Sequence, residues 1–79
     1  MANMRAKMVI NRVEHYEGSD KLYFSAVCPN NFDSEGLDED NTYAKYTPSA
    51  DLQMLITNPA LLGKFKASEV FYIDFTKVE

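Results

Sequence analysis

The strongest constraint on the fold is an alternation of apolar and other residues between Ala50 and Thr76. It places Leu52, Met54 and Ile56 in one phase, and Phe71, Ile73 and Phe75 repeat the pattern near the end of the chain. A period of two is expected of a strand with one buried face. Between the two runs, Asn58 is placed to cap a helical turn, with Pro59 at its first position and Gly63 at its end. The stretch therefore predicts two strands joined by a short helical turn.

The N-terminal part of the chain predicts a hairpin. Residues 5–16 are rich in apolar and β-branched residues, but Met8 and Ile10 lie in one phase and Val13 lies in the other. A bulge near Asn11 and Arg12 reconciles the two phases. Residues 17–20 (EGSD) form a turn cluster, and the alternating run at 21–28 is the second strand.

The middle of the chain predicts a long loop followed by a short strand. Pro29 stops the second strand, and residues 30–41 (NNFDSEGLDEDN) are mostly polar and acidic. The run TYAKY at 42–46 favours a short strand. Residues 47–49 then turn the chain, and Phe65 is expected to enter the core beneath the helical turn.

Together these elements predict an all-β fold in one domain, residues 1–79. Five short strands and one helical turn between the last two strands indicate a small antiparallel barrel or sandwich. Closure would remove the exposed sheet edges that invite unwanted pairing. A chain of 79 residues is long enough for only one modest core.

Composition narrows the classes of function. Eight basic and twelve acidic residues give a formal net charge of −4, which disfavours the bulk attraction to phosphate typical of nucleic-acid binders. The one cysteine, Cys28, cannot form an internal disulfide, and a reducing compartment fits best. No run approaches the roughly 20 apolar residues of a membrane span, so we expect a soluble protein without an export signal and without a membrane partner.

Catalytic and metal-binding signatures are weak throughout. His15 and Cys28 are single residues of their kind, which excludes a metal site built from several His or Cys ligands. Cys28 is in phase with the apolar side of its strand, and His15 adjoins the hairpin turn, where we expect it to be exposed. We find neither a phosphate-binding glycine loop nor a nucleophile elbow, and we expect neither an enzyme nor a bound cofactor or metal.

The acidic loop has three readings. A calcium-loop template starting at Asn31 fails at its twelfth position, where Thr42 cannot supply a bidentate carboxylate. A solvated loop extended by charge repulsion is the simplest interpretation. The third reading is a protein-binding loop in which acids engage a basic surface and an apolar residue anchors the contact. The residues of this protein-binding prediction, with two nearby tyrosines, are Phe32, Asp33, Glu35, Asp38, Glu39, Asp40, Tyr43 and Tyr46.

Tyrosines on the predicted strands suggest a working surface. Rings beside positive charge suit single-stranded nucleic acid, and the same rings suit a protein interface. Ordinary cross-strand packing is the simpler explanation for some of them. The residues of the nucleic-acid alternative are Tyr23, Tyr43, Lys45 and Tyr72 as the stacking platform, and Arg5, Lys7 and Arg12 as phosphate contacts.

Three segments carry a resemblance: MRAKMVINRVEHYEG, EDNTYAKYTPSADLQMLITNPALLGKF and VFYIDFT. They are similar to small uncharacterised proteins of tailed bacteriophages, which share a start like MRAK, a central K-[YF]-[ST]-P-S and a late I-x-N-P followed by Y-x-[VI]-D-F. These motifs mark turns and strand ends, so the resemblance implies a common fold and a phage origin more than a common activity. Ser68 departs from it, because glycine is expected in the turn before the last strand.

Two classes of function follow. The first, which we prefer, is a noncatalytic phage-type binding protein, either a virion-associated component or an inhibitor of a host protein, located in the host cytoplasm or the virion. The second is a single-stranded nucleic-acid binder of OB type. The acidic balance favours a protein partner, and the sequence leaves homo-oligomerisation open.

Overall fold

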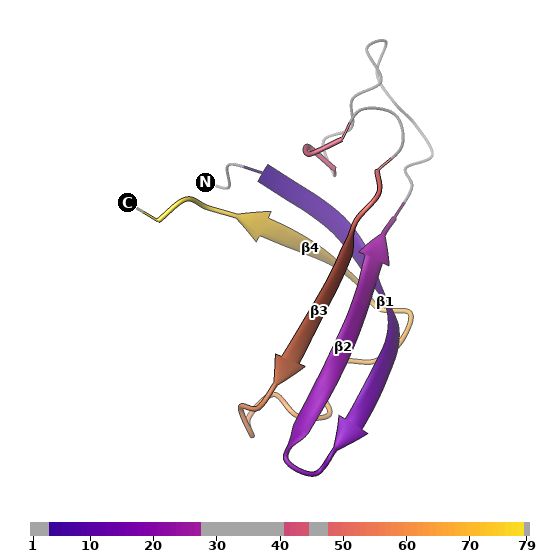
Figure 1. Cartoon of the computed structure of the whole chain (residues 1–79), viewed down its shortest axis with the longest axis vertical. Coiled ribbons are helices and arrows are strands. Elements are labelled where there is room, and N and C mark those ends of the chain that lie inside the picture. The colour runs from indigo at the N-terminus through magenta and orange to yellow at the C-terminus, as the bar shows by residue number, and fades with distance from the viewer. Residues whose placement is uncertain (1–3, 28–40, 45–47, 79) are drawn as a thin grey trace.

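The computed structural model describes residues 4–27, 41–44 and 48–78, and these form one antiparallel sheet (Figure 1). Its four strands are β1 (Met4–Tyr16), β2 (Ser19–Ala26), β3 (Asp51–Ile56) and β4 (Val70–Phe75). Their spatial order is β3-β2-β1-β4. The all-β prediction is confirmed for the described residues.

The longest strand, β1, pairs with a neighbour on each side. Met8 to Tyr16 pair with β2, and Met4 to Val9 pair with β4. The register with β2 shifts between Ile10 and Arg12, which confirms the bulge predicted at Asn11. One extra residue restores the phase of the apolar side chains and increases the local twist. Both halves of β1 can therefore face the same core.

The predicted hairpin is also confirmed. Tyr16 pairs with Ser19, which leaves Glu17 and Gly18 as a two-residue loop. Gly18 has a φ of +76°, a conformation that costs little only for glycine. The second strand starts at Ser19, two residues earlier than predicted, and its last described strand residue is Ala26. Cys28 lies outside the described residues.

The predicted barrel is wrong, because the sheet is open, and the described strands form one sheet where the alternative sandwich needs two. A barrel needs its two edge strands to pair, and here β3 and β4 lie at opposite edges with β2 and β1 between them. The connection from β3 to β4 instead packs Leu62 and Phe65 against the core. These side chains cover one face of the sheet, so the core is shielded without closure. The predicted fifth strand at 42–46 is also wrong in its described part, since Thr42 and Tyr43 form a turn; Lys45 and Tyr46 lie outside the described residues.

The predicted helical turn at 58–63 is a series of tight turns, and the described residues contain no helix. Asn58 does cap this segment: its Oδ1 accepts the Ala60 N–H at 3.0 Å, and its carbonyl accepts the Leu61 N–H at 2.9 Å. The Lys64 N–H then reaches back only three residues, to the Leu61 carbonyl. So short a segment cannot offset the cost of helix nucleation. Gly63 ends it with a φ of +75°.

The core lies on one face of the sheet and is small. Its buried apolar residues are Ala6, Met8, Ile10, Leu22, Phe24 and Ile56. Phe71 meets Phe24 edge-on at 6.4 Å between ring centroids and Phe65 at 5.5 Å, which confirms Phe65 as a core contact. Met54 and Phe75 share the core phase but are each 46% exposed, against the prediction. They belong to edge strands, where no further strand in the described part of the chain covers their outer side.

A buried carboxylate attaches the segment after β3 to the hairpin. Asp20 is only 6% exposed, and its two oxygens bond the Gly63 N–H and His15 Nδ1, each at 2.8 Å. The bond from Gly63, followed by that from His15, lowers the pKa of Asp20 from its ordinary value. His15 is exposed, as predicted, with 67% of its side chain accessible. The ionised form of Asp20 therefore contributes stability that is lost as the pH falls through its lowered pKa.

Ser68, at the position where the phage resemblance expects glycine, adopts glycine geometry. Its φ is +77°, in the left-handed region that residues with a Cβ rarely occupy. Its N–H donates to the Ile10 carbonyl at 2.8 Å, and Ile10 N–H donates to the Glu69 carbonyl at 2.9 Å. These two bonds hold the turn beside β1. The serine therefore bears left-handed backbone strain at this turn.

We predict that Ser68→Gly stabilises the protein. The substitution relieves the left-handed strain, which stabilises the folded state, and it gives the unfolded chain more freedom, which partly offsets that gain. The free energy of unfolding should rise by about 0.5–1 kcal/mol. Urea denaturation measures it. The matched control is Ala67→Gly, one residue earlier at a position outside the left-handed region, which should destabilise. A loss of stability in Ser68→Gly would contradict the assignment of strain to this residue.

Candidate binding surface

The sheet face opposite the core, here called the outer face, carries most of the polar and aromatic strand residues. Alternation along each strand places on it the residues between the core positions. None of them is buried. The outer face includes Arg5, Lys7, Arg12, Glu14, Tyr16, Lys21, Tyr23, Asp51, Gln53, Tyr72 and Asp74.

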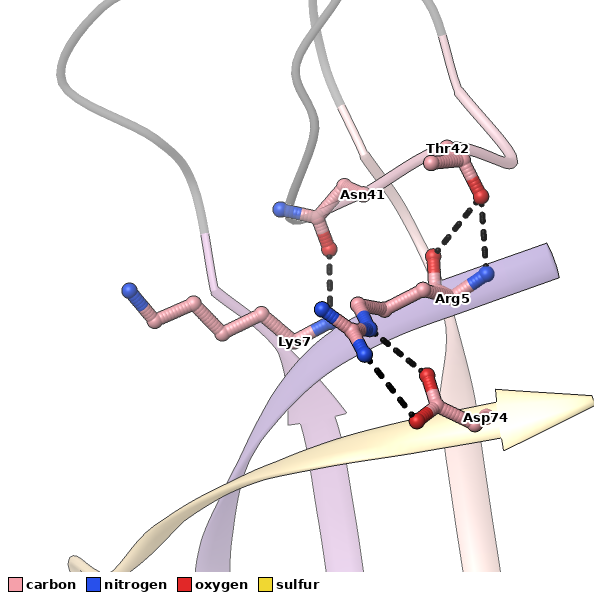
Figure 2. A network of polar contacts seen from close by, with 5 residues as sticks. All are labelled: Arg5, Lys7, Asn41, Thr42 and Asp74. Carbon is pink, nitrogen blue, oxygen red and sulfur yellow. Dashed lines mark hydrogen bonds and ion pairs between the residues drawn. The ribbon is translucent and has the colours of Figure 1, made fainter. Parts of the chain in front are cut away.

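The first group on the outer face, the Arg5 cluster, joins β1 to β4 (Figure 2). Arg5 donates to both carboxylate oxygens of Asp74, from Nε at 2.7 Å and from Nη2 at 3.2 Å. Its guanidinium also lies 4.5 Å from the centroid of the Tyr72 ring. The ion pair lowers the pKa of Asp74 from its ordinary value. The bidentate geometry fixes the orientation of Arg5 above the ring.

Asn41 and Thr42 complete the sheet beside this cluster, where β2 has ended (Figure 2). The Thr42 N–H donates to the Arg5 carbonyl at 2.9 Å, and the Arg5 N–H donates to Thr42 Oγ1 at 2.7 Å. The Lys7 N–H donates to Asn41 Oδ1 at 2.9 Å, and Asn41 Nδ2 donates to the Val27 carbonyl at 3.2 Å. Asn41 is 1% exposed, so its side chain replaces the backbone partners of a missing strand. The first half of β1 is thereby held on both sides.

The second group, the Arg12 cluster, joins β1 to β2 around Glu14. Tyr23 and Tyr16 each donate their O–H to Glu14 Oε1, at 2.6 and 2.9 Å. The Arg12 guanidinium lies 4.1 Å from the Tyr23 ring centroid, and Lys21 Nζ lies 5.2 Å from it. Arg12 Nε also approaches Glu14 Oε2 at 3.7 Å. One carboxylate therefore orients two phenol groups and a guanidinium.

The hydrogen bonds of the Arg12 cluster shift three pKa values. The bond from Tyr23, followed by that from Tyr16, lowers the pKa of Glu14. The hydrogen bond that Tyr16 donates to Glu14 raises the pKa of Tyr16 above its ordinary value. The Tyr23 hydroxyl, and then Glu14, raise the pKa of Arg12. The cluster is therefore fixed with Glu14 and Arg12 charged and Tyr16 neutral near pH 7.

A half-open hollow of about 300 Å³ adjoins Arg12 on the outer face. Its side-chain polar groups come from the bulge on β1, from β2 and from β3. The residues that line it are Asn11, Arg12, Tyr23, Phe24, Asp51, Leu52 and Gln53. Amide, guanidinium and carboxylate groups meet there beside an aromatic ring, and this combination can bind a polar group of a partner.

The structure brings together most of the residues predicted for nucleic-acid binding. Arg5, Lys7, Arg12, Tyr23 and Tyr72 all lie on the outer face. Tyr43 does not, because it packs against the core from the opposite face. Lys45 lies outside the described residues.

The residues predicted for protein binding are mostly outside the described part of the chain. Tyr43 alone falls within it, and it lies on the core side. Tyr43 is half-buried there, so in both predictions it lies apart from the residues of the outer face. The others outside the described residues are Phe32, Asp33, Glu35, Asp38, Glu39, Asp40 and Tyr46.

Several residues of the two clusters were missed by the sequence reasoning: Glu14, Tyr16, Lys21 and Asp74. A signal was present, because Arg12 and Glu14 are two residues apart on one strand, and so are Tyr72 and Asp74. Residues at that spacing share a face of a strand. The cross-strand partners could not be read from spacing, since they depend on the register.

In the described part of the chain, no group of three or more His, Cys, Asp or Glu side chains is placed to hold a metal ion. No helix among residues 4–27, 41–44 and 48–78 is long and apolar enough to cross a membrane. Comparison with protein-family models, curated proteins and solved structures found no match. The geometry of the outer face is therefore the basis for a functional proposal.

We predict that Glu14→Gln lowers the pKa of Tyr16 toward its ordinary value, because the charged acceptor that opposes phenol ionisation is removed. Phenolate absorbance during a pH titration measures the pKa of Tyr16. Tyr16→Phe is titrated in the wild-type and in the Glu14→Gln protein, and the difference in each case separates Tyr16 from the other four tyrosines. Glu17→Gln in the adjacent turn is the matched control. An unmoved Tyr16 titration in Glu14→Gln would show that the cluster does not form.

Proposed function

We propose that this chain is a noncatalytic binding protein of phage type that engages a protein partner through the outer face of its sheet. The partner is a virion protein or a host protein, so that the chain serves as a virion-associated accessory component or as a host-directed inhibitor. The observation that carries the proposal is the pair of Arg–Tyr stacks, Arg5 with Tyr72 and Arg12 with Tyr23, on a sheet face where none of these side chains is buried.

Tyrosine and arginine are the residues most enriched at protein interfaces and among their energetic hot spots. Here each guanidinium is held over a ring by a carboxylate, Asp74 in one cluster and Glu14 in the other. Side chains that are ordered before binding lose less entropy when a partner docks. The outer face is therefore prepared for a specific contact.

The charge pattern of the outer face favours protein over nucleic acid. Cations and carboxylates are interspersed on it, and both arginines approach a carboxylate on the same face. A phosphate backbone would meet those carboxylates as well as the cations, and the whole chain carries a net charge of −4. A protein surface with its own mixed charges can match such a pattern.

Single-stranded nucleic acid is the second candidate, favoured by one observation. Tyr23 and Tyr72 share the outer face with Arg5, Lys7 and Arg12, and aromatic rings beside cations form the usual platform for unpaired bases. Because the sheet is open, this candidate would use an open sheet surface in place of the OB barrel expected from the sequence.

The decisive experiment is partner capture with matched variants. The tagged protein is used to isolate partners from phage-infected bacterial cells, and the proteins recovered are quantified by mass spectrometry. Arg12→Ala and Tyr23→Ala should each weaken the affinity for the partner by about 30-fold, the loss typical of a hot-spot residue, and so lower its recovery. Lys64→Ala, which removes an exposed cation from the segment after β3, should leave recovery unchanged.

Two further arms of this experiment separate the candidates. Reversal of Asp38, Glu39 and Asp40 to lysine measures whether the acidic loop contributes to the same contact. Titration with a fluorescent single-stranded oligonucleotide at low salt should show no binding. Binding that weakens steeply with salt and is lost in Arg12→Ala would support the second candidate. Equal capture by the wild type, Arg12→Ala and Tyr23→Ala would contradict a role for the outer face.

A further inference from the structure

Exposed apolar side chains gather at one edge of the sheet. Among the described residues, β4 contributes Val70 at 49%, Tyr72 at 50% and Phe75 at 46% exposed. Met4, the β1 partner of Phe75, is 37% exposed, and Val78 just beyond β4 is 90% exposed. The opposite edge strand, β3, contributes only Met54 and Leu55. These side chains lie on both faces of the sheet along one edge, and exposed apolar surface in such number is typical of an interaction site.

The backbone of the same strand is directed toward a further partner. The Ile10 N–H donates to the Glu69 carbonyl, and the Ser68 N–H donates to the Ile10 carbonyl. These bonds show which residues of β1 and β4 direct their backbone groups toward each other, because hydrogen-bonded and non-hydrogen-bonded pairs alternate along antiparallel strands. The odd-numbered residues of β4 therefore face β1, and Val70 and Asp74 direct their backbone groups outward. In the described sheet order no strand follows β4 on that side. The strand contains no Lys or Pro, two residues that often protect an edge, and Asp74 is its one charged residue.

We propose that two copies of this chain associate by antiparallel pairing of their β4 strands about a two-fold axis, so that the four strands of each copy join in one continuous sheet. The inference goes beyond the proposed function and does not depend on it. Such a contact is isologous, and it closes after two copies.

The side chains of β4 select the register of the pair. With Ile73 opposite the partner's Ile73, Phe71 lies opposite the partner's Phe75, and the core side of the contact is apolar throughout. On the outer face, Tyr72 lies opposite the partner's Asp74. The Arg5 guanidinium lies 4.5 Å from the Tyr72 ring centroid and bonds Asp74 of its own chain, so the partner's carboxylate would join an existing ion pair beside that ring. Pairing centred on Tyr72 would instead place Asp74 opposite the partner's Val70, where β4 offers no opposite charge.

An apolar hollow continues this edge on the core side of the sheet. It measures about 120 Å³ and is lined by Met4, Met8, Leu52, Phe75 and neighbouring residues. Phe75 and Met4 thus have exposed apolar surface next to the proposed contact. Pairing of β3 with β4 of another copy is the competing arrangement; it does not close, and it would produce filaments.

The test is the mass of the native protein in solution, by analytical ultracentrifugation over a range of concentrations. The wild type should approach twice the 9.0 kDa mass of one chain. Val70→Pro removes an outward N–H but no bond to β1, and Val70→Lys places a charge at the edge; both should yield monomers. Gln53→Pro is the matched control, because its N–H is directed outward at the β3 edge, and it should leave the dimer intact.

Cross-linking supplies an independent readout. In the proposed register Ile73 faces its copy at a non-hydrogen-bonded site, where Cα atoms lie about 4.5 Å apart, within disulfide range. Ile73→Cys in a Cys28→Ser background should therefore form a dimer on mild oxidation, and Met54→Cys in the same background should not. A wild type that stays monomeric, a dimer lost only in Gln53→Pro, or growth into filaments would each overturn the proposal.

Discussion

The arrangement of this sheet depends on β1, which pairs with β2 on one side and with β4 on the other. Its second half pairs with β2, and its first half pairs with β4 on one side and with Asn41 and Thr42 on the other. The bulge at Asn11 makes this possible, because it corrects the phase of the apolar residues midway along a strand of 13 residues. Without that correction, the residues beyond Ile10 would direct their apolar side chains to the outer face.

The two faces of the sheet therefore differ in solvent exposure. The segment between β3 and β4 covers the core face with Leu62 and Phe65, and Asp20 attaches it to the hairpin through Gly63. The outer face keeps its polar and aromatic residues accessible, and internal hydrogen bonds and ion pairs hold them in place. Binding chemistry on such a face needs no cavity, which suits a chain with so small a core.

The sequence was sufficient for features that depend on near neighbours. It predicted the bulge, the hairpin, the alternating strands and the contact of Phe65 with the core. Closure into a barrel was wrongly predicted, because the spatial order of strands depends on contacts between distant residues. The clusters around Arg5 and Glu14 were missed for the same reason. Asp74 lies 69 residues from Arg5 in the chain, and only the register brings them together.

The open sheet can be distinguished from a closed barrel by nuclear Overhauser contacts between strand protons. We expect contacts between the Hα protons of Arg5 and Asp74 and of Lys7 and Tyr72, which are opposed at non-hydrogen-bonded sites of β1 and β4. We expect none between β3 and β4 of one chain. A regular ladder of contacts between β3 and β4 within one chain would instead show a closed barrel.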